Sequence, residues 1–348
     1  MLYEFLKENI LTNPNKTIRD VERTVTYAES IKNAEQLGDS LIHQKYGILC
    51  KSELNAAIGL LACFYAKKTP VMLSHRYDEN HIQKVIRSIK LSHIITDEGV
   101  VEISEVKTEK EKLDDVALIM CVAASGGYVR GLMITEENLL ININEISDCF
   151  KITKNDKIFI SRSLYHCSVL IGELLISFVK GLDIIFFNND FIPGKIAEFI
   201  EEQGISILCT TPTLYSVISN FSIDKKEGKA LPLKTIAIDG RGMTFTIAGK
   251  MFRAFISTKF YSIYCLSKTK SGVGCMSWEM FSRFPITKRK SSKLIETKVI
   301  NKKLYIKPQN TVKGYYEDIE LTKNRLKDGW LCVGEIFKND FYKLRLIK

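Results

Sequence analysis

The chain has 348 residues but lacks a hydrophobic run long enough to cross a membrane. Its longest nearly apolar stretch, residues 56–66, ends at Lys67 and Lys68. That is short of the roughly 20 residues that a membrane-spanning helix needs. The first residues, MLYEFLKENI, mix charged with apolar side chains, whereas a secretory signal has a basic segment followed by an apolar one. We therefore expect no membrane span and a cytoplasmic location.

Cysteine and histidine are present, but not at the spacings that bind metals or build a disulfide framework. The nine cysteines are odd in number, are scattered through mostly apolar segments and never form a CxxC pair. The five histidines form no HxH or HxxxH pattern. Zinc sites usually combine such closely spaced ligands. We therefore expect reduced, buried thiols, as in a cytoplasmic protein, and no metal-ligand cluster.

Glycine and proline are too few, at 20 and 7 residues, for a collagenous or low-complexity chain. With 45% hydrophobic and 26% charged residues the composition is that of a globular protein. At roughly 150 residues per domain the length predicts two to three domains. The formal net charge is +10, and the densest basic stretch is KRKSSK at residues 288–293. No aromatic residues alternate with these basic ones, so we interpret the stretch as a solvated loop and expect no nucleic acid partner.

Strands and helices are expected to alternate along most of the sequence. Between Thr24 and Asp97, short apolar runs such as YGILC alternate with segments of helical apolar spacing such as AESIKNAEQLGDSLIHQ. This order predicts an α/β fold with parallel sheets. The charged segment 105–115 is typical of a surface linker, and the last third of the chain alternates as β-rich segments do. We predict two parallel-sheet α/β lobes plus a small β-rich subdomain, at residues 1–110, 111–260 and 261–348.

A glycine-rich turn, SGGYVRG at residues 125–131, separates a predicted strand from the helix predicted for EENLLININEISDCF. Backbone N–H groups of a turn at a helix N-terminus point at one spot and bind anions, phosphate especially. Ser125 would donate its hydroxyl and Arg130 would supply a fixed charge. Close backbone approach would be permitted by Gly126, Gly127 and Gly131. The alternative is that these glycines serve only the geometry of a strand-to-helix connection.

Several segments, taken in order, resemble the adenylate-forming (AMP-binding) superfamily, which includes the acyl- and aryl-CoA synthetases. SGGYVRG stands where that family has its phosphate loop, LYH at residues 164–166 resembles PLFH, and YCLSK at residues 264–268 falls at YGxTE. The most specific stretch is GYYEDIELTKNRLKDGWLCVGEIF, residues 314–337, which is very like GYWNNPEATxxxFxDGWLxTGDLG. The resemblance runs from near residue 20 to the end and implies the N-terminal domain fold of adenylate-forming enzymes.

The resemblance implies a ligase that works in two steps. A carboxylate attacks the α-phosphate of ATP to give an acyl-adenylate and pyrophosphate, and a thiol then takes the acyl group. Phosphate binding would fall to the turn at residues 125–131, with Arg130 as a catalytic residue, and the substrate pocket to Tyr165 and His166. The remaining nucleotide contacts would be Gly240, Arg241, Gly242, Tyr264, Ser267 and Glu335. The implied partners are a carboxylic acid and a thiol acceptor, either CoA or an acyl carrier protein.

The sequence departs from the family pattern where charge matters. Lys268 stands where the family has a glutamate that ligates Mg²⁺, and an ammonium group cannot ligate a metal. The resemblance therefore implies ATP or AMP as cofactor but argues against ordinary Mg²⁺ use. Lys268 would pair with phosphate instead, which makes it the second catalytic candidate. The phosphate loop is also two residues shorter than SGTTGxPKG, and its lysine becomes Arg130.

The family's smaller C-terminal lid domain has no room in this chain, so we expect it to be absent here or supplied by a separate chain. This leaves an alternative function: a degenerate, non-adenylating homologue that acts as a binding or scaffold subunit, or that serves another acyl transfer. Simpler interpretations also stay open for single residues, with His166 as a core histidine, Lys268 as a solvated loop lysine and Tyr264 as a buried aromatic.

Overall fold

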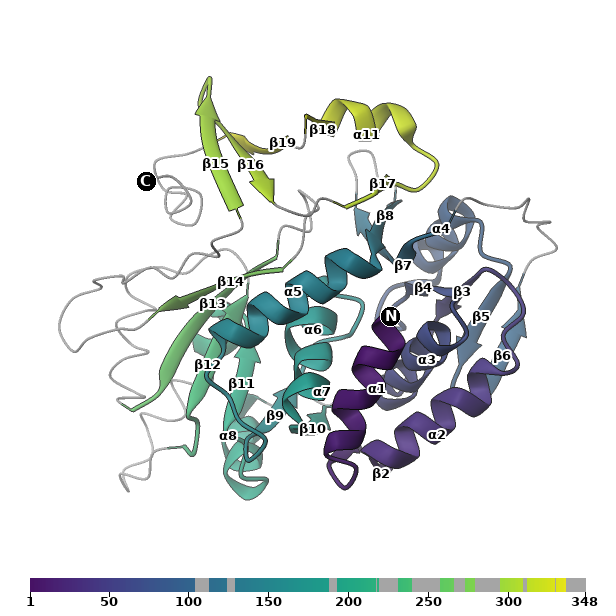
Figure 1. Ribbon diagram of the computed structural model, residues 1–348. Coiled ribbons are helices and arrows are strands. Elements are labelled where there is room, and N and C mark those ends of the chain that lie inside the picture. Colours follow the sequence, from purple (N-terminus) through teal and green to yellow (C-terminus); the bar gives the residue numbers. More distant parts are fainter. Residues whose placement is uncertain are drawn as a thin grey trace.

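The structure is a computed structural model, and the strands of its described residues form three sheets (Figure 1). One sheet has eight strands, one has seven and one has four. The predicted class, two α/β lobes plus a small β-rich subdomain, is confirmed. The residues that the structure describes are 1–103, 113–123, 129–187, 193–216, 218, 231–239, 257–265, 273–278, 295–308, 312–328 and 330–335.

The seven-stranded sheet has the order β17-β8-β7-β4-β3-β5-β6. Its inner strands pair in parallel, while β6, β8 and β17 pair antiparallel with their neighbours. The strands are β3 (Lys45–Ile48), β4 (Thr69–Met72), β5 (His93–Thr96), β6 (Gly99–Glu102), β7 (Val116–Ala123), β8 (Val129–Thr135) and β17 (Gly314–Tyr315).

The helices that precede β3, β4 and β5 begin where the sequence supplies capping side chains. They are α2 (Tyr27–Gly38), α3 (Glu53–Tyr65) and α4 (Glu79–Ile89). Thr26 and Glu29 form a capping box at the start of α2, and Ser52 and Asp78 accept backbone N–H groups at the starts of α3 and α4. The alternation predicted between residues 24 and 97 is therefore confirmed.

The eight-stranded sheet has the order β14-β13-β12-β11-β9-β10-β1-β2, with antiparallel pairs only at its two ends. Its strands are β1 (Thr17–Arg19), β2 (Thr24–Thr26), β9 (Lys157–Ile160), β10 (Asp183–Phe186), β11 (Ile207–Thr210), β12 (Thr235–Asp239), β13 (Lys259–Cys265) and β14 (Val273–Trp278). The helical segments of this part are α5 (Glu136–Cys149), α6 (Cys167–Val169), the π-helix η2 (Leu170–Leu175), α7 (Ile176–Lys180) and α8 (Pro193–Glu202).

Sheet membership does not follow the predicted lobe boundaries at residues 110 and 260. The N-terminal hairpin of β1 and β2 joins the eight-stranded sheet, because β1 pairs in parallel with β10. Conversely, β7 and β8 complete the seven-stranded sheet, although they follow residue 110. Strands β13 and β14 extend the eight-stranded sheet to Trp278.

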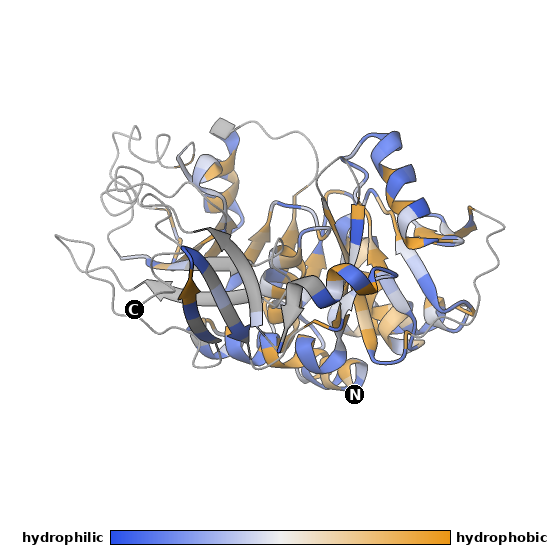
Figure 2. Cartoon of the chain, turned by 90° about the horizontal axis from the view of Figure 1, so that it is seen from above, coloured by the Kyte–Doolittle hydropathy of each residue, from blue (hydrophilic) through white to orange (hydrophobic). Residues whose placement is uncertain are grey.

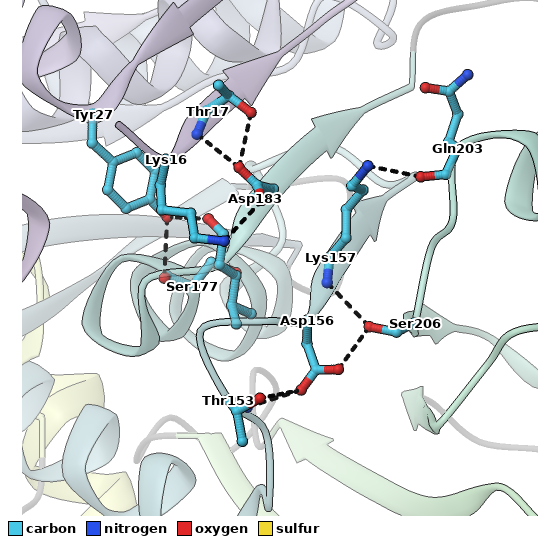
Figure 3. A network of polar contacts seen from close by, with 11 residues as sticks. Lys16, Thr17, Tyr27, Thr153, Asp156, Lys157, Ser177, Asp183, Gln203 and Ser206 are labelled. Atoms are coloured by element: carbon cyan, nitrogen blue, oxygen red, sulfur yellow. Dashed lines mark hydrogen bonds and ion pairs between the residues drawn. The ribbon is translucent and has the colours of Figure 1, made fainter. Parts of the chain in front are cut away.

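Polar contacts hold the N-terminal hairpin in place (Figure 3). The carboxylate of Asp183, the first residue of β10, accepts from the backbone N–H and the hydroxyl of Thr17, each at 2.9 Å. It also forms a 2.9 Å ion pair with Lys16. The buried hydroxyl of Tyr27 donates to the carbonyl oxygens of Ser177 and Leu182. These contacts tie residues 16–27 to the segment that leads into β10.

A second network in Figure 3 fixes the starts of β9 and β11. The hydroxyl of Ser206 donates to the carboxylate of Asp156 at 2.9 Å and accepts from the backbone N–H of Lys157 at 3.1 Å. The other carboxylate oxygen of Asp156 accepts from the backbone N–H of Thr153 at 2.9 Å. These contacts fix the backbone at the amino ends of the two strands. The candidate site described below lies at their carboxyl ends.

One hydrophobic cluster spans the two lobes, and each lobe has a further cluster of its own. Buried residues of the seven-stranded sheet, such as Met72 and Leu118, belong to the same cluster as Ile158 and Ile184 of the eight-stranded sheet. Helix α1 (Leu2–Thr12) contributes Leu2, Tyr3, Leu6 and Ile10, and it contacts α2, α3, α5 and α7. Hydrophobic residues accordingly gather on the strands of both sheets, while the outward helix faces carry hydrophilic ones (Figure 2).

The small subdomain is an antiparallel sheet in the order β15-β16-β19-β18. Its strands are β15 (Ile295–Ile300), β16 (Lys303–Pro308), β18 (Leu326–Lys327) and β19 (Trp330–Glu335), and helix α11 (Ile319–Arg325) precedes β18.

Among the described residues, no helix is both long enough and apolar enough to span a membrane.

Candidate nucleotide and acid site

The glycine turn predicted at residues 125–131 does not adjoin a helix N-terminus, because its last residues, 129–131, belong to strand β8, so that prediction is wrong. Strands β7 and β8 pair antiparallel on its two sides, with Val122 opposite Arg130 and Cys121 opposite Gly131. Helix α5 begins only at Glu136, after the seven residues of β8. The sequence VRGLMIT alternates buried with less buried residues and continues as a strand, which moves the helix dipole away from the turn. Ser125, Gly126 and Gly127 lie outside the described residues.

Gly131 is explained by close packing. A Cβ atom at this position would lie 2.6 Å from Cδ1 of Ile89, 2.8 Å from Cγ2 of Ile119 and 3.1 Å from Cβ of Tyr316. Real Cβ atoms do not approach other carbons so closely in a packed interior. The requirement for glycine in β8 therefore comes from close packing against helix α4, the neighbouring strand β7 and the residue after β17.

Arg130 forms an ion pair that joins the hairpin to the stretch with the most specific sequence resemblance. Its Nε lies 3.3 Å from Oδ2 of Asp318, and each side chain is about one-third exposed. Asp318 also accepts the backbone N–H of Leu321 at 3.0 Å, which caps helix α11. One face of Arg130 is therefore neutralised, while the exposed part remains available to an anion.

Gly314 and Thr322 pack against each other within residues 314–337, the same stretch. Gly314 has φ of 137°, and a Cβ there would lie 2.6 Å from Cγ2 of Thr322. The hydroxyl of Thr322 accepts the N–H of Tyr315 at 2.9 Å. Glycine and threonine at these two positions allow β17 to add to β8.

Tyr165 and His166, the predicted acid-pocket residues, lie in the loop between β9 and α6, at the carboxyl end of β9. The Tyr165 ring is buried, with its edge toward Tyr77 at 5.0 Å and toward His166 at 5.8 Å between ring centroids. His166 remains accessible to solvent. Nevertheless, the surrounding protein desolvates its ring, and with the charge of Arg162 this lowers its pKa. A satisfied core histidine would be buried, so the exposed position argues against that alternative, and the role of His166 in an acid pocket stays a prediction.

Glu53 connects the ends of the two sheets. It lies in the first turn of α3, and Oε2 of its buried carboxylate accepts the backbone N–H of Leu164 at 3.1 Å. Burial raises the pKa of Glu53. The loop that carries Tyr165 and His166 is thus fixed to a helix of the seven-stranded sheet, so that both sheets position the candidate pocket.

A buried ionic cluster beside this loop is the feature that sequence reasoning missed. The guanidinium of Arg162 lies 2.5 Å from Oε1 of Glu173 and 2.6 Å from Oδ2 of Asp239. Ser168 donates to the same oxygen of Asp239 at 2.5 Å. Asp239 is the last residue of β12 and directly precedes Gly240, where the adenine turn is expected.

One sequence signal could have revealed this cluster. Arg162 and Glu173 are the charged residues within residues 158–179, IFISRSLYHCSVLIGELLISFV, where most of the other side chains are apolar. Charges in such a setting are expected to be paired, because burying an unpaired charge is unfavourable. The third partner, Asp239, lies far along the chain and could not be assigned without the fold.

The other predicted site residues are only partly placed. Tyr264 lies in β13, next to β12 and opposite Gly274, and Glu335 ends β19 opposite Lys303. The side chains of both are outside the description. The remaining predicted residues lie outside the described ranges altogether; they are Gly240, Arg241, Gly242, Ser267 and Lys268. Within the described part of the chain, no group of three or more His, Cys, Asp or Glu side chains is arranged to hold a metal ion.

Comparison with known proteins identifies relatives of this chain. The chain is 21% identical over 240 residues to a feruloyl-CoA synthase of Amycolatopsis sp, a match that covers 64% of this chain and 47% of the relative. It is 21% identical over 316 residues to a long-chain-fatty-acid–CoA ligase of Haemophilus influenzae, covering 81% of this chain and 53% of that protein. The chain therefore spans about half the length of these relatives.

The fold is similar to that of the o-succinylbenzoate coenzyme A synthetase MenE of Bacillus subtilis, solved in complex with AMP. The TM-score is 0.76 at 17% identity, and the match covers 94% of this chain and 93% of that structure. The model of the AMP-binding enzyme family matches residues 99–316, which include the β7–β8 hairpin, the Arg162 cluster and β17. The chain therefore belongs to the AMP-binding enzyme family.

Proposed function

We propose that this protein activates a carboxylic acid with ATP to give an acyl-adenylate, from which the acyl group passes to a thiol. The observation that carries the proposal is the family match across residues 99–316. It spans the β7–β8 hairpin, where phosphate would bind, and the loop with Tyr165 and His166, where the acid would bind. Support comes from the parallel strands β9 and β12, whose carboxyl ends lie on the same side of one sheet. Ligands of α/β proteins bind at the carboxyl ends of such strands.

Each part of the nucleotide has a proposed set of contacts. The turn with Ser125, Gly126 and Gly127 would bind phosphate through backbone N–H groups, and Arg130 would add positive charge. Tyr264 and the turn at residues 240–242 would contact adenine, with Ser267 beside them, and Glu335 would contact the ribose. Lys268 would neutralise phosphate charge in place of a Mg²⁺ ligand, so we propose a weaker dependence on Mg²⁺ than a metal-ligating glutamate would give.

Exchange of labelled pyrophosphate into ATP tests the proposed reaction. We expect acid-dependent exchange with at least one member of a panel of fatty and aromatic acids, because acyl-adenylate formation is reversible. A thiol acceptor, CoA or an acyl carrier protein, would then consume the adenylate. The assay is run with and without a separately supplied lid domain of an AMP-binding enzyme. No exchange with any acid under either condition, in protein shown to be folded, would contradict the proposal.

Arg130 gives a second test that does not require turnover. Arg130→Ala should remove the increase in melting temperature that ATP produces, because it removes the phosphate-binding charge. Asp318→Asn should keep or enlarge the ATP-induced increase in melting temperature, because it removes the ion pair with Arg130. Its side-chain oxygen can still cap α11. Arg87→Ala, at an exposed arginine of α4, serves as the control for net charge. An unchanged ATP effect in Arg130→Ala would reject the assigned role.

A further inference from the structure

Arg162 connects three parts of the candidate site through one side chain. It lies in the loop after β9 and forms ion pairs with Glu173 of η2 at 2.5 Å and with Asp239 at the end of β12 at 2.6 Å. The planar guanidinium suits such a bridge, because its donors point in fixed directions. Its partners come from a helix behind the loop and from the strand that leads into the expected adenine turn.

Stability alone does not account for this cluster. The Glu173 side chain is fully buried, and its Oε2 has no hydrogen-bond partner among the described residues. Nε of Arg162 is likewise buried without a partner there. Replacing a buried ion pair by apolar side chains often leaves a protein as stable or more stable. The cluster is therefore better explained by the geometry it imposes.

Two side chains from the segment that carries the predicted acid-pocket residues contact Asp239. Arg162 and Ser168 both contact its Oδ2, and Tyr165 and His166 lie between them in the chain. The end of β12 and the pocket loop are thus joined directly. Glu173 holds Arg162 from behind, in a π-helical turn, a conformation often found near functional sites.

We propose that Arg162 is a positioning residue that holds Asp239, at the carboxyl end of β12, in register with the loop that carries Tyr165 and His166, and that Glu173 anchors Arg162 for this task. The inference rests on the proposed function. In adenylation the carboxylate must meet the α-phosphate at attack distance, and a displacement of about 1 Å can slow such a step about a hundredfold. Arg162 touches neither ligand in this account and acts through Asp239.

Arg162→Lys tests the proposal, because lysine keeps the charge but cannot span both carboxylates in a fixed plane. We expect kcat for pyrophosphate exchange to fall by about a hundredfold. KM for ATP and for the acid should change little. Glu173→Gln retains a hydrogen-bond acceptor for Arg162 and should lose less activity than Glu173→Leu. An unchanged kcat in folded Arg162→Lys would overturn the proposal, and so would a rise in KM for the acid with kcat unchanged, since that identifies a ligand contact.

The pH profile separates positioning from a general loss of packing. Glu173 faces Arg162 of the β9 loop, Asp239 of β12 and Cys209 of β11, and His166 lies near Arg162. Ionisation of Glu173 strengthens its ion pair with Arg162, so kcat of the wild type should rise with pH. This rise in kcat should be absent in Glu173→Gln. The same rise in both proteins would count against the anchoring role.

Hydrogen exchange provides a readout that is independent of turnover. Arg162→Lys should speed amide exchange of residues 236–239 in β12, whereas Asp148→Asn, at an exposed aspartate of α5, should not. If the wild type shows no pyrophosphate exchange with any acid, the proposed function fails. If amide exchange of β12 is the same in wild type and Arg162→Lys, the positioning inference fails, whatever the activity.

Discussion

The ammonium group of Lys16 lies 2.9 Å from the carboxylate of Asp183, although 167 residues separate them in the chain. Burial pushes the pKa of Asp183 upward, but the ion pair with Lys16 and the two Thr17 donors outweigh it and hold the pKa below its usual value. The charged carboxylate is therefore stabilised in the folded state. Its contribution is present at neutral pH and is lost as pH falls through the lowered pKa.

Asp183→Asn should reduce the free energy of unfolding at pH 7 by about 1–2 kcal/mol, because the ion pair and the charge-assisted hydrogen bonds are lost. Urea denaturation between pH 3 and pH 7 measures the effect, and the difference from wild type should shrink toward the acidic end. Asp148→Asn, at an exposed aspartate of α5, is the matched control and should change little. Equal losses in the two variants would show that the contacts of Asp183 do not stabilise the fold.

Tyr27→Phe should lower the free energy of unfolding by about 1–3 kcal/mol, because it removes the donor to the buried carbonyl oxygen of Leu182. The carbonyl oxygen of Ser177 still accepts the backbone N–H of Leu182. The hydroxyl donates to Leu182 at 2.6 Å and to Ser177 at 3.1 Å. Tyr65→Phe removes a hydrogen bond to Asp39 that is open to solvent, and should have a smaller effect. Thermal and urea unfolding of both variants make the comparison, and a neutral Tyr27→Phe would contradict the assigned role of the hydroxyl.

Gly131→Ala should destabilise the protein by about 1–3 kcal/mol, because the added methyl group overlaps Ile89 and Ile119. The closest approach is to Cδ1 of Ile89, which valine lacks. The double variant Gly131→Ala with Ile89→Val should therefore lose less stability than the sum of the single variants. Strict additivity in the double-mutant cycle would show that this contact does not limit the position.

Glu173→Gln should change how stability depends on pH. Burial raises the pKa of Glu173 to about 7, against the opposing attraction of Arg162. A raised pKa means that the folded protein holds a proton which the unfolded chain releases near pH 4.5. The contribution of Glu173 to stability is full below that value and is lost as pH rises to about 7, by roughly 3 kcal/mol.

Urea unfolding from pH 4.5 to pH 8 measures this effect, and the decline should be smaller in Glu173→Gln than in wild type. Glu202→Gln, at an exposed position in α8, should retain the wild-type decline. Identical pH dependence in wild type and Glu173→Gln would show that this carboxylate does not titrate with a raised pKa.

The alternation of strands and helices was predictable because it is encoded locally. Helix α2 has both its apolar spacing and its capping box within fifteen residues, and the parallel strands are short apolar runs. The sheet to which β1 belongs was not predictable. Strand β1 has only three residues, and its partner β10 is distant in the chain. The local sequence therefore does not indicate which of the two sheets β1 joins.

The candidate site also contains parts that the local sequence indicates and parts that depend on the fold. The segments that carry Tyr165, His166 and Arg130 were found because short motifs preserve their order. The helix N-terminus expected beside Arg130 was wrong because VRG, residues 129–131, was taken as part of the turn, although with LMIT it forms strand β8. The Arg162 cluster depends on contacts among β9, η2 and β12, which a single sequence does not specify.

The pairing of β1 with β10 also bears on how the chain is made. Residues 17–26 leave the ribosome well before residue 183 has been translated, so the hairpin presents an open hydrogen-bonding edge for much of synthesis. The lobe that contains β3, β4 and β5 can form during this interval, whereas the sheet that includes β1 closes late. Nascent chains halted before residue 183 should therefore be the ones most prone to aggregate or to engage chaperones.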